Sequence, residues 1–218
     1  MSNRKGQAQT LFNKGLKFFR GDGVQKNKTS AAEYFKKAAE LGNVQSMVFL
    51  GQMFSSGDGT PVDKPKSYEY FKRAANLGNV FAMVNMARVL FNGVDIQPNK
   101  EEAAKYFKKA AEKGHTESMY YYGIMLHQGE GVELNKKLAA TYLRMAAEKG
   151  NIEAMFQYGI LVRDGDGIEE SPREAVKYFR KAADKGNAKA MANYGKALFN
   201  GEGIAEDKRK AAEYFKKS

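Results

Sequence analysis

Two kinds of amphipathic segment alternate along the whole chain. Residues 31–38 place apolar side chains at the i, i+3, i+4 and i+7 positions that predict a helix with one buried face. Residues 47–54 show the same spacing with larger apolar side chains. Gly42 stands between the two segments, where glycine can take the left-handed conformation that ends a helix, and Asn43 can cap the next helix. The pattern therefore predicts short helices joined by turns that contain glycine.

This pattern returns every 36 residues. Tyrosine occupies one position of the period six times, at Tyr34, Tyr70, Tyr106, Tyr142, Tyr178 and Tyr214. Glycine occupies another, at Gly42, Gly78, Gly114, Gly150 and Gly186. Self-similarity at a fixed period of this length indicates a repeat array. We place the copies at approximately 7–42, 43–78, 79–114, 115–150, 151–186 and 187–218, the last one truncated.

Other positions of the period indicate where helices begin and how closely they pack. A residue that can cap a helix recurs at Asn27, Asp63, Asn99, Asn135, Ser171 and Asp207. A small residue recurs in the middle of the second kind of helix, at Gly51, Ala87, Gly123, Gly159 and Gly195. Because glycine inside a helix costs up to about 1 kcal/mol relative to alanine, this recurrence predicts the close approach of a neighbouring helix.

The predicted fold class is all-α. Each expected helix has about 11 to 14 residues, too few to be stable alone in water, so neighbouring copies must bury one another's apolar faces. We therefore expect an α-α superhelix, a right-handed solenoid of six two-helix repeats. Four prolines and no glycine-serine tract leave no obvious linker, so we expect a single solenoid domain over residues 1–218.

The repeated motifs AMxxxG, GxGV and AxxYFxKAAxxGN closely resemble those of the Sel1-like repeat family, a branch of the tetratricopeptide-type helical repeats. The resemblance covers essentially the whole chain. It implies a scaffold or adaptor that assembles signalling or protein-quality-control complexes and has no catalysis of its own. Some members serve membrane-bound ubiquitin-ligase complexes, and such an adaptor role is kept as an alternative.

Three positions depart from the repeated pattern. Asp95 stands where the second glycine of the GxG loop belongs, so this loop is expected to bend differently. Lys14 stands in an otherwise apolar column, as expected of a terminal repeat that faces solvent. The sequence ends at Ser218 inside a helix, so either the array is longer or its last helix frays.

The charge of the chain suggests further classes of partner. Formal net charge is +11, and residues 1–42 contribute nine basic and three acidic side chains, a net charge of +6. A basic column is complete, at Lys36, Lys72, Lys108, Arg144, Arg180 and Lys216. Acidic residues four positions later partly neutralise it, at Glu40, Glu112, Glu148 and Asp184. Nucleic-acid binding is therefore not favoured, and a basic adaptor for a membrane surface is kept as an alternative.

The sequence offers little for catalysis or metal binding. There is no cysteine, which excludes disulfides and thiolate zinc sites. The GxG loops lack the preceding strand of a dinucleotide site, and a calcium loop beginning at Asp164 would have Ala175 where a glutamate is required. His115 and His127 are expected to be capping or solvated. We therefore expect no enzyme activity, cofactor, metal or small-molecule substrate. The sequence also shows no leader and no long apolar segment, which predicts a cytoplasmic location.

The candidate binding residues follow from aligning Gly51 with the small residue of the tetratricopeptide pattern, which places ligand-facing columns at 45, 48, 49, 52 and 55 and their equivalents. Some members, such as Val48 and Tyr120, can instead pack between repeats. The mixture of aromatic and charged side chains is typical of a peptide groove on the concave face. The predicted protein-binding residues are Gln45, Phe49, Gln52, Phe81, Asn85, Arg88, Glu117, Tyr121, Ile124, Glu153, Phe156, Gln157, Ile160, Lys189, Asn193 and Lys196.

Overall fold

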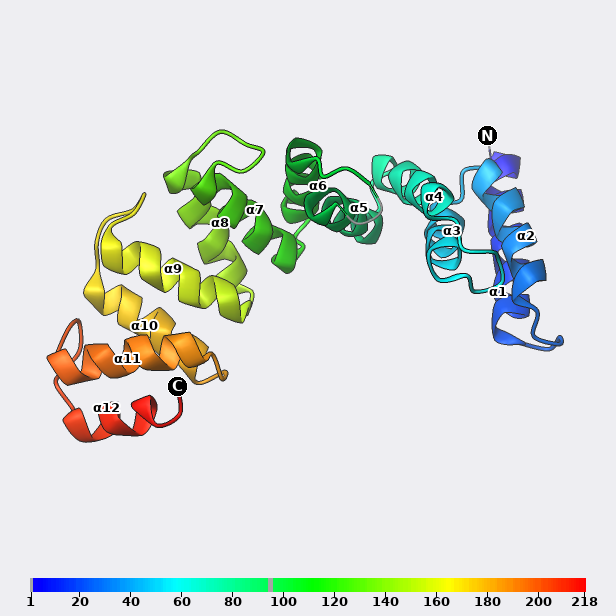
Figure 1. The fold of residues 1–218 in the computed structure, drawn as a ribbon. Coiled ribbons are helices and arrows are strands. Elements are labelled where there is room, and N and C mark those ends of the chain that lie inside the picture. Colours follow the sequence, from blue (N-terminus) through cyan, green and yellow to red (C-terminus); the bar gives the residue numbers. More distant parts are fainter. Residues whose placement is uncertain (1, 94–95) are drawn as a thin grey trace. The chain divides into compact units, whose positions relative to one another are not determined.

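The computed structural model describes residues 2–93 and 96–218, and over these ranges it contains helices and no strand. The helices are α1 (Ser2–Arg20), α2 (Lys28–Glu40), α3 (Val44–Ser56), α4 (Lys64–Asn76), α5 (Val80–Asn92), α6 (Lys100–Glu112), α7 (Thr116–Gln128), α8 (Lys136–Glu148), α9 (Ile152–Asp164), α10 (Pro172–Ala183), α11 (Ala188–Asn200) and α12 (Lys208–Phe215) (Figure 1). The all-α prediction is confirmed. Asp95, whose loop was expected to bend differently, lies outside the described residues.

Each repeat consists of an A helix, which has an odd number, and the B helix that follows it. The chain divides into two compact units, residues 1–99 with α1 to α5 and residues 100–218 with α6 to α12. Within each unit the extensively packed pairs are consecutive helices, so a B helix lies between the A helix of its own repeat and that of the next (Figure 1). This confirms the solenoid pattern of packing, whereas the single domain over residues 1–218 stays a prediction.

Helix boundaries follow the predicted caps. The Asn27 side chain accepts a hydrogen bond from the Ser30 amide at 2.9 Å, and Asn43 accepts one from the Ser46 amide at 2.8 Å. The same bond is made by the side chains of Asp63, Asn79, Asn135, Asn151, Ser171, Asn187 and Asp207. Each such cap contributes about 1 kcal/mol of helix stability.

The glycine inside α1, α3, α7, α9 and α11 provides space for an aromatic ring or a leucine of the B helix in the same repeat. A methyl group added at Gly51 would lie 2.9 Å from the ring of Phe71, and one at Gly159 would lie 2.8 Å from the ring of Phe179. Phe71 and Phe179 are themselves 8% and 2% exposed. The predicted close approach of a neighbouring helix is therefore confirmed at these positions.

In repeats one, two, four, five and six the tyrosine of the B helix contacts the A helix of its repeat in one of two ways. In repeats one and two the ring stacks on a phenylalanine, with Tyr34 5.5 Å from Phe18 and Tyr70 5.8 Å from Phe54. In repeats four to six the contact is edge-on to a tyrosine four residues earlier in the A helix, in the pairs Tyr142 with Tyr122, Tyr178 with Tyr158 and Tyr214 with Tyr194. The space between the two helices is thus filled by an aromatic ring from one of two successive turns of the A helix.

In repeats two, four and five the GxG loop between the A and B helices attaches the repeat to the one before it. The residue between the glycines forms an ion pair with the first lysine of the preceding B helix. In repeat two this is Asp58, whose Oδ2 lies 2.6 Å from Nζ of Lys28. Lys100 with Glu130 and Lys136 with Asp166 make the equivalent pairs, each at 2.8 Å. A methyl group added at Gly59 would lie 2.6 Å from Lys28, so the loop lies directly against the preceding helix.

One histidine has a different role from the one expected. His115 caps α7, accepting from the Ser118 amide at 3.2 Å, as predicted. The prediction of a capping or solvated His127 is wrong, because its Nε2 lies 2.8 Å from the Asp166 carboxylate of the next repeat. The difference arises because the His127 side chain, at the end of α7, is long enough to contact a loop 39 residues further along the chain.

Residues 2–93 and 96–218 contain no helix long and apolar enough to cross a membrane. Over the same ranges no three His, Cys, Asp or Glu side chains are grouped so that they could hold a metal ion. The cytoplasmic location expected from the sequence stays a prediction.

Candidate peptide-binding face of the A helices

The predicted binding residues all lie on A helices and differ in how far they are exposed. Seven are exposed, namely Gln45, Gln52, Phe81, Arg88, Glu153, Lys189 and Lys196. Eight are half-buried, namely Phe49, Asn85, Glu117, Tyr121, Ile124, Gln157, Ile160 and Asn193. Phe156 is only 6% exposed and lies 6.2 Å from the ring of Phe179, so its side chain belongs mainly to the core.

In the first unit, α3 and α5 carry an aromatic surface. Phe49 lies 4.9 Å from Phe35 and 5.5 Å from Phe19, so one side of its ring is fixed by packing. Phe81 is 48% exposed and its ring lies 6.3 Å from Phe71. Rigid aromatic side chains with one exposed side present apolar area at a small cost in conformational entropy.

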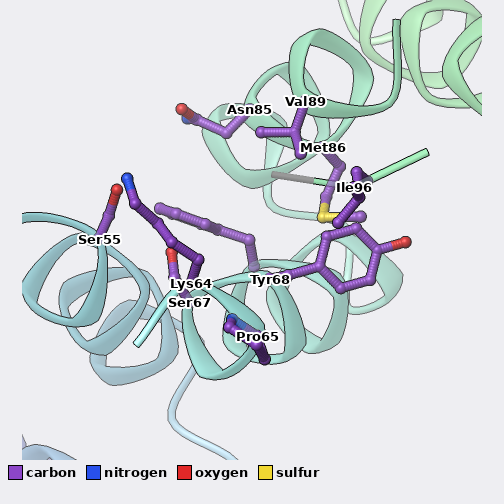
Figure 2. Close-up of a pocket in the computed structure, with 10 residues that line it drawn as sticks. Ser55, Lys64, Pro65, Ser67, Tyr68, Asn85, Met86, Val89 and Ile96 are labelled. Carbon is purple, nitrogen blue, oxygen red and sulfur yellow. The ribbon is translucent and has the colours of Figure 1, made fainter. Parts of the chain in front are cut away.

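A pocket of about 360 Å³ opens between α3, α4 and α5. Figure 2 shows Asn85, Met86 and Val89 of α5 on one side and Lys64, Ser67 and Tyr68 of α4 on the other. The remaining lining residues are Ser55, Pro65, Phe71 and Ile96. Its apolar part is thus formed by aliphatic, aromatic and thioether side chains, and its volume is within the range of sites that hold small ligands or anchoring side chains.

The polar groups at this pocket are held by the fold. The Ser67 hydroxyl donates to the carbonyl oxygen of Gly51 at 2.7 Å, in a buried position. The Asn85 amide donates to the carbonyl oxygen of Phe81 at 2.8 Å. Since Asn85 was predicted as a binding residue and Ser55 lies in a predicted ligand-facing column, the pocket adjoins the predicted face.

The second unit has a pocket at the equivalent register, between α9, α10 and α11, with a volume of about 310 Å³. Here Arg163 replaces Ser55 and donates from Nη1 to Oδ1 of Asn193 at 2.9 Å, while its guanidinium lies 6.0 Å from the Phe179 ring centre. Asp164 holds the same guanidinium through a 2.6 Å bond to Nε. A charged guanidinium therefore lines this pocket at the position where the first unit has the Ser55 hydroxyl.

The A helices of the second unit use several predicted binding residues for internal contacts. Tyr121 stacks on Phe107 at 5.1 Å and meets Tyr120 edge-on at 5.3 Å. Burial, with Glu153 adding to it, raises the pKa of Tyr120. Glu153 also accepts a hydrogen bond from the Asn187 side chain at 3.1 Å, which joins the starts of two successive A helices.

Comparison with known proteins identifies the repeat. The sequence model of the Sel1 repeat matches six times, at residues 15–43, 44–79, 80–115, 116–151, 152–187 and 188–218. The chain belongs to the Sel1 repeat family. No curated protein sequence matches this Sel1 repeat chain.

Two solved Sel1-type structures resemble the chain over nearly all of its length. One is a protective antigen of uropathogenic Escherichia coli strains that displays an SLR fold, with 30% identity and a TM-score of 0.86 over 98% of this chain. The chain spans 46% of the length of that antigen. The other is a Sel1 repeat protein from Oxalobacter formigenes, with 25% identity and a TM-score of 0.70 over 100% of this chain and 87% of that one.

Sequence reasoning missed the B-helix side of the first pocket, although a signal was present. Comparing the six Sel1 repeats, Ser67 is the only polar residue in a column of alanines. Tyr68 follows it in a column that otherwise holds alanine or valine. Searching the columns of both helices for departures, and not only the A helices, would have found these two positions.

Proposed function

We propose that this Sel1 repeat chain is a protein-interaction scaffold whose A-helix faces bind an extended or helical segment of a partner protein. Sel1 repeat proteins generally act as scaffolds for protein interactions, which supports the general role. The specific support is the pocket between repeats two and three beside the exposed ring of Phe81. An apolar side chain of the partner occupies this pocket while the flanking segment crosses α3 and α5.

The pocket is the observation that carries this proposal. An anchoring side chain contributes most when it enters a preformed recess whose walls are already ordered, because little entropy is lost on binding. The walls here are fixed by the Ser67 bond to Gly51 and by the packing of Phe71 against the same glycine. Gln52 and Arg88, which are exposed on the same two A helices, supply polar contacts around the anchor.

Substitution can place in this pocket the charged side chains that the chain already uses at the equivalent pocket of the second unit. Ser55→Arg with Ser56→Asp gives repeat two the Arg163 and Asp164 of repeat five, opposite Asn85 of the following repeat, which corresponds to Asn193. We expect at least ~10-fold weaker partner binding, because a hot-spot pocket contributes on the order of 2 kcal/mol. Quantitative crosslinking mass spectrometry on cells expressing each form of the full chain measures the loss.

The matched control adds the same two charges away from the face, as Gln25→Arg with Thr29→Asp at exposed positions of repeat one. It is expected to retain every partner of the unmodified chain. If the pocket variant keeps the same partners at the same occupancy, the binding site lies elsewhere.

The charge distribution favours a protein partner over nucleic acid. Three members of the basic column lie beside the acidic residue four positions later, at 3.9 Å for Lys108 with Glu112 and for Arg144 with Glu148 and 3.7 Å for Arg180 with Asp184. Such pairing lowers the density of free positive charge that a phosphate backbone requires. The ubiquitin-ligase and membrane-surface adaptor roles stay alternatives to the one proposed.

A further inference from the structure

The outer face of the B helix in repeat four is apolar where the other repeats are charged or polar. One column reads Ser30, Lys66, Glu102, Leu138, Glu174 and Lys210. A second reads Lys37, Arg73, Lys109, Met145, Lys181 and Lys217. Between them, Thr141 stands in a column that is charged in every other repeat, at Glu33, Glu69, Lys105, Lys177 and Glu213. The fold needs none of these apolar residues, since five copies do without them.

The basic residue that Met145 replaces has a defined place in every other copy. Its cationic group lies over the ring of the tyrosine three residues earlier, at centroid distances of 5.8 Å for Lys37, 5.5 Å for Arg73, 5.9 Å for Lys109, 5.1 Å for Lys181 and 5.9 Å for Lys217. In repeat four the tyrosine is Tyr142 and the covering cation is absent from the sequence. The exchange therefore gives up a favourable contact and adds exposed apolar area.

These substitutions border a recess on the second unit. A hollow of about 460 Å³ is lined by Ala111, Glu112 and Gly114 at the end of α6, Met119 of α7, and Leu138, Thr141, Tyr142, Met145 and Lys149 at α8. Leu138 and Met145 are each 37% exposed, and Met119 at the floor is 2% exposed. The two exposed residues are seven positions apart on α8, which is about two helical turns or 10.5 Å along the axis. We call this recess the repeat-four patch.

The segments of α6 and α8 next to the patch, which we call its rim, carry more basic than acidic residues. Residues 105–113 carry Lys105, Lys108, Lys109 and Lys113 against Glu112, which is four minus one or +3. Residues 137–149 carry Lys137, Arg144 and Lys149 against Glu148, which is three minus one or +2. Both acidic residues lie 3.9 Å from a basic side chain of the same helix. Glu112 and Lys149 are the charged residues that line the recess itself, and the flanking segments supply the excess of positive charge.

We propose that the repeat-four patch docks an acidic amphipathic helix of a partner protein. Apolar side chains two turns apart on that helix enter the recess beside Leu138 and Met145, and its flanking Asp and Glu side chains face the lysines of the rim. A second copy of this chain would place the same basic rim against itself, which is repulsive. A membrane surface would require apolar side chains that protrude, whereas these border a hollow.

The test uses substitutions taken from repeat five. Leu138→Glu, Thr141→Lys and Met145→Lys together give α8 the residues Glu174, Lys177 and Lys181 of α10. The folded state already accommodates that set in the equivalent helix, and far-ultraviolet circular dichroism checks it. The matched control is Leu77→Lys, which changes another exposed leucine to the residue that its column holds in repeats three to five.

The probe is a synthetic 18-residue helical peptide with leucine at i, i+3, i+4, i+7 and i+11 and glutamate at most other positions. Its binding to the full chain is measured by fluorescence anisotropy, beside a scrambled peptide of the same composition and a peptide with lysine in place of glutamate. We expect the acidic amphipathic peptide to bind at least tenfold more tightly than either of the others. The triple variant loses at least tenfold of this affinity, and Leu77→Lys loses none.

The location of binding is read from the ¹³C-labelled methyl group of Met145, whose NMR signal is expected to shift with the peptide. Equal binding of the acidic peptide by the triple variant, or equal binding of the scrambled peptide, overturns the proposal. So does a dimer in sedimentation that the triple variant abolishes, which would assign the patch to a second copy. Binding to anionic lipid vesicles that only the triple variant loses would assign it to a membrane.

Discussion

At the scale of single residues, the contact between the A-helix glycine and the B-helix ring controls how closely two helices approach. Gly51 and Gly159 each meet a phenylalanine ring at a distance that leaves no room for a side chain. The cost of glycine in a helix is thus offset by the apolar area that the close approach buries. By contrast, Gly6 of α1 has no atom within 4 Å of the place where a methyl group would lie.

These two environments predict opposite effects for one substitution. Gly51→Ala is expected to destabilise the fold by about 1 to 3 kcal/mol, because Phe71 must move out of its rotamer or away from α3. Gly6→Ala is expected to be neutral or stabilising by up to about 1 kcal/mol, because alanine is the better helix former. Urea unfolding followed by circular dichroism measures both, and an unchanged midpoint for Gly51→Ala would contradict the packing argument.

At the scale of helices and loops, the two halves of the chain fill the same space in different ways. Repeat two has Leu50 and, one helical turn later, Phe54. The B-helix tyrosine of this repeat, Tyr70, stacks on Phe54. Repeat four has Tyr122 followed by Leu126, and the contact moves one turn earlier. A large and a smaller side chain thus exchange places while the B-helix tyrosine stays constant. Sequence columns alone record this exchange as variation and do not show that it conserves the packing.

The junction between repeats four and five is sensitive to acid. Hydrogen bonds from Lys136 first, and then from His127, lower the pKa of Asp166 below its ordinary value of 3.8. A carboxyl group with a lowered pKa stabilises the folded state fully above that ordinary value, and the contribution disappears as the pH falls through the folded-state pKa. Stability should therefore fall with pH below about 4, in part through this group.

Asp166→Asn removes that contribution. Its melting temperature is expected to fall less between pH 6 and about pH 2 than that of the unmodified chain. Glu169→Gln, an exposed carboxyl group in the same loop, is the control and should keep the original dependence. Thermal melts at a series of pH values measure the difference, and identical slopes for all three proteins would show that the junction does not respond to acid.

At the scale of the whole molecule, stability in an array of this kind is approximately a sum over repeats and the contacts between neighbours. Deleting residues 152–187, one complete matched repeat, joins α8 and its turn to α11 in the register that α9 occupied. The shortened chain is expected to fold with unchanged helicity per residue and a lower melting temperature, because one repeat and one junction are lost. Loss of helicity would show that this repeat is not interchangeable with its neighbours.

The sequence determined the fold far better than it determined the binding site. Period, caps and the small-residue column all follow from local chemistry repeated six times, so each prediction was supported by several copies. The binding residues were chosen by alignment to another repeat type, and this alignment does not indicate how deeply each side chain is buried. Phe156 lies in the same helix register as Tyr120, yet burial differs because neighbouring side chains differ. Ser67, Tyr68 and Met145 are informative for the opposite reason, since each departs from its column.

The second glycine of the GxG loops has a consequence for how such a molecule can change in length. Gly59 lies against Lys28 of the preceding copy, and Gly131, Gly167 and Gly203 lie in the same way against the copies before them. Repeats two, four, five and six thus carry the loop that engages the previous repeat, and the repeat before each of them carries the surface that receives this loop. Tandem duplication of one 36-residue repeat supplies a matched junction between repeats at once. Gaining or losing part of a repeat would leave a loop without the preceding helix that it contacts.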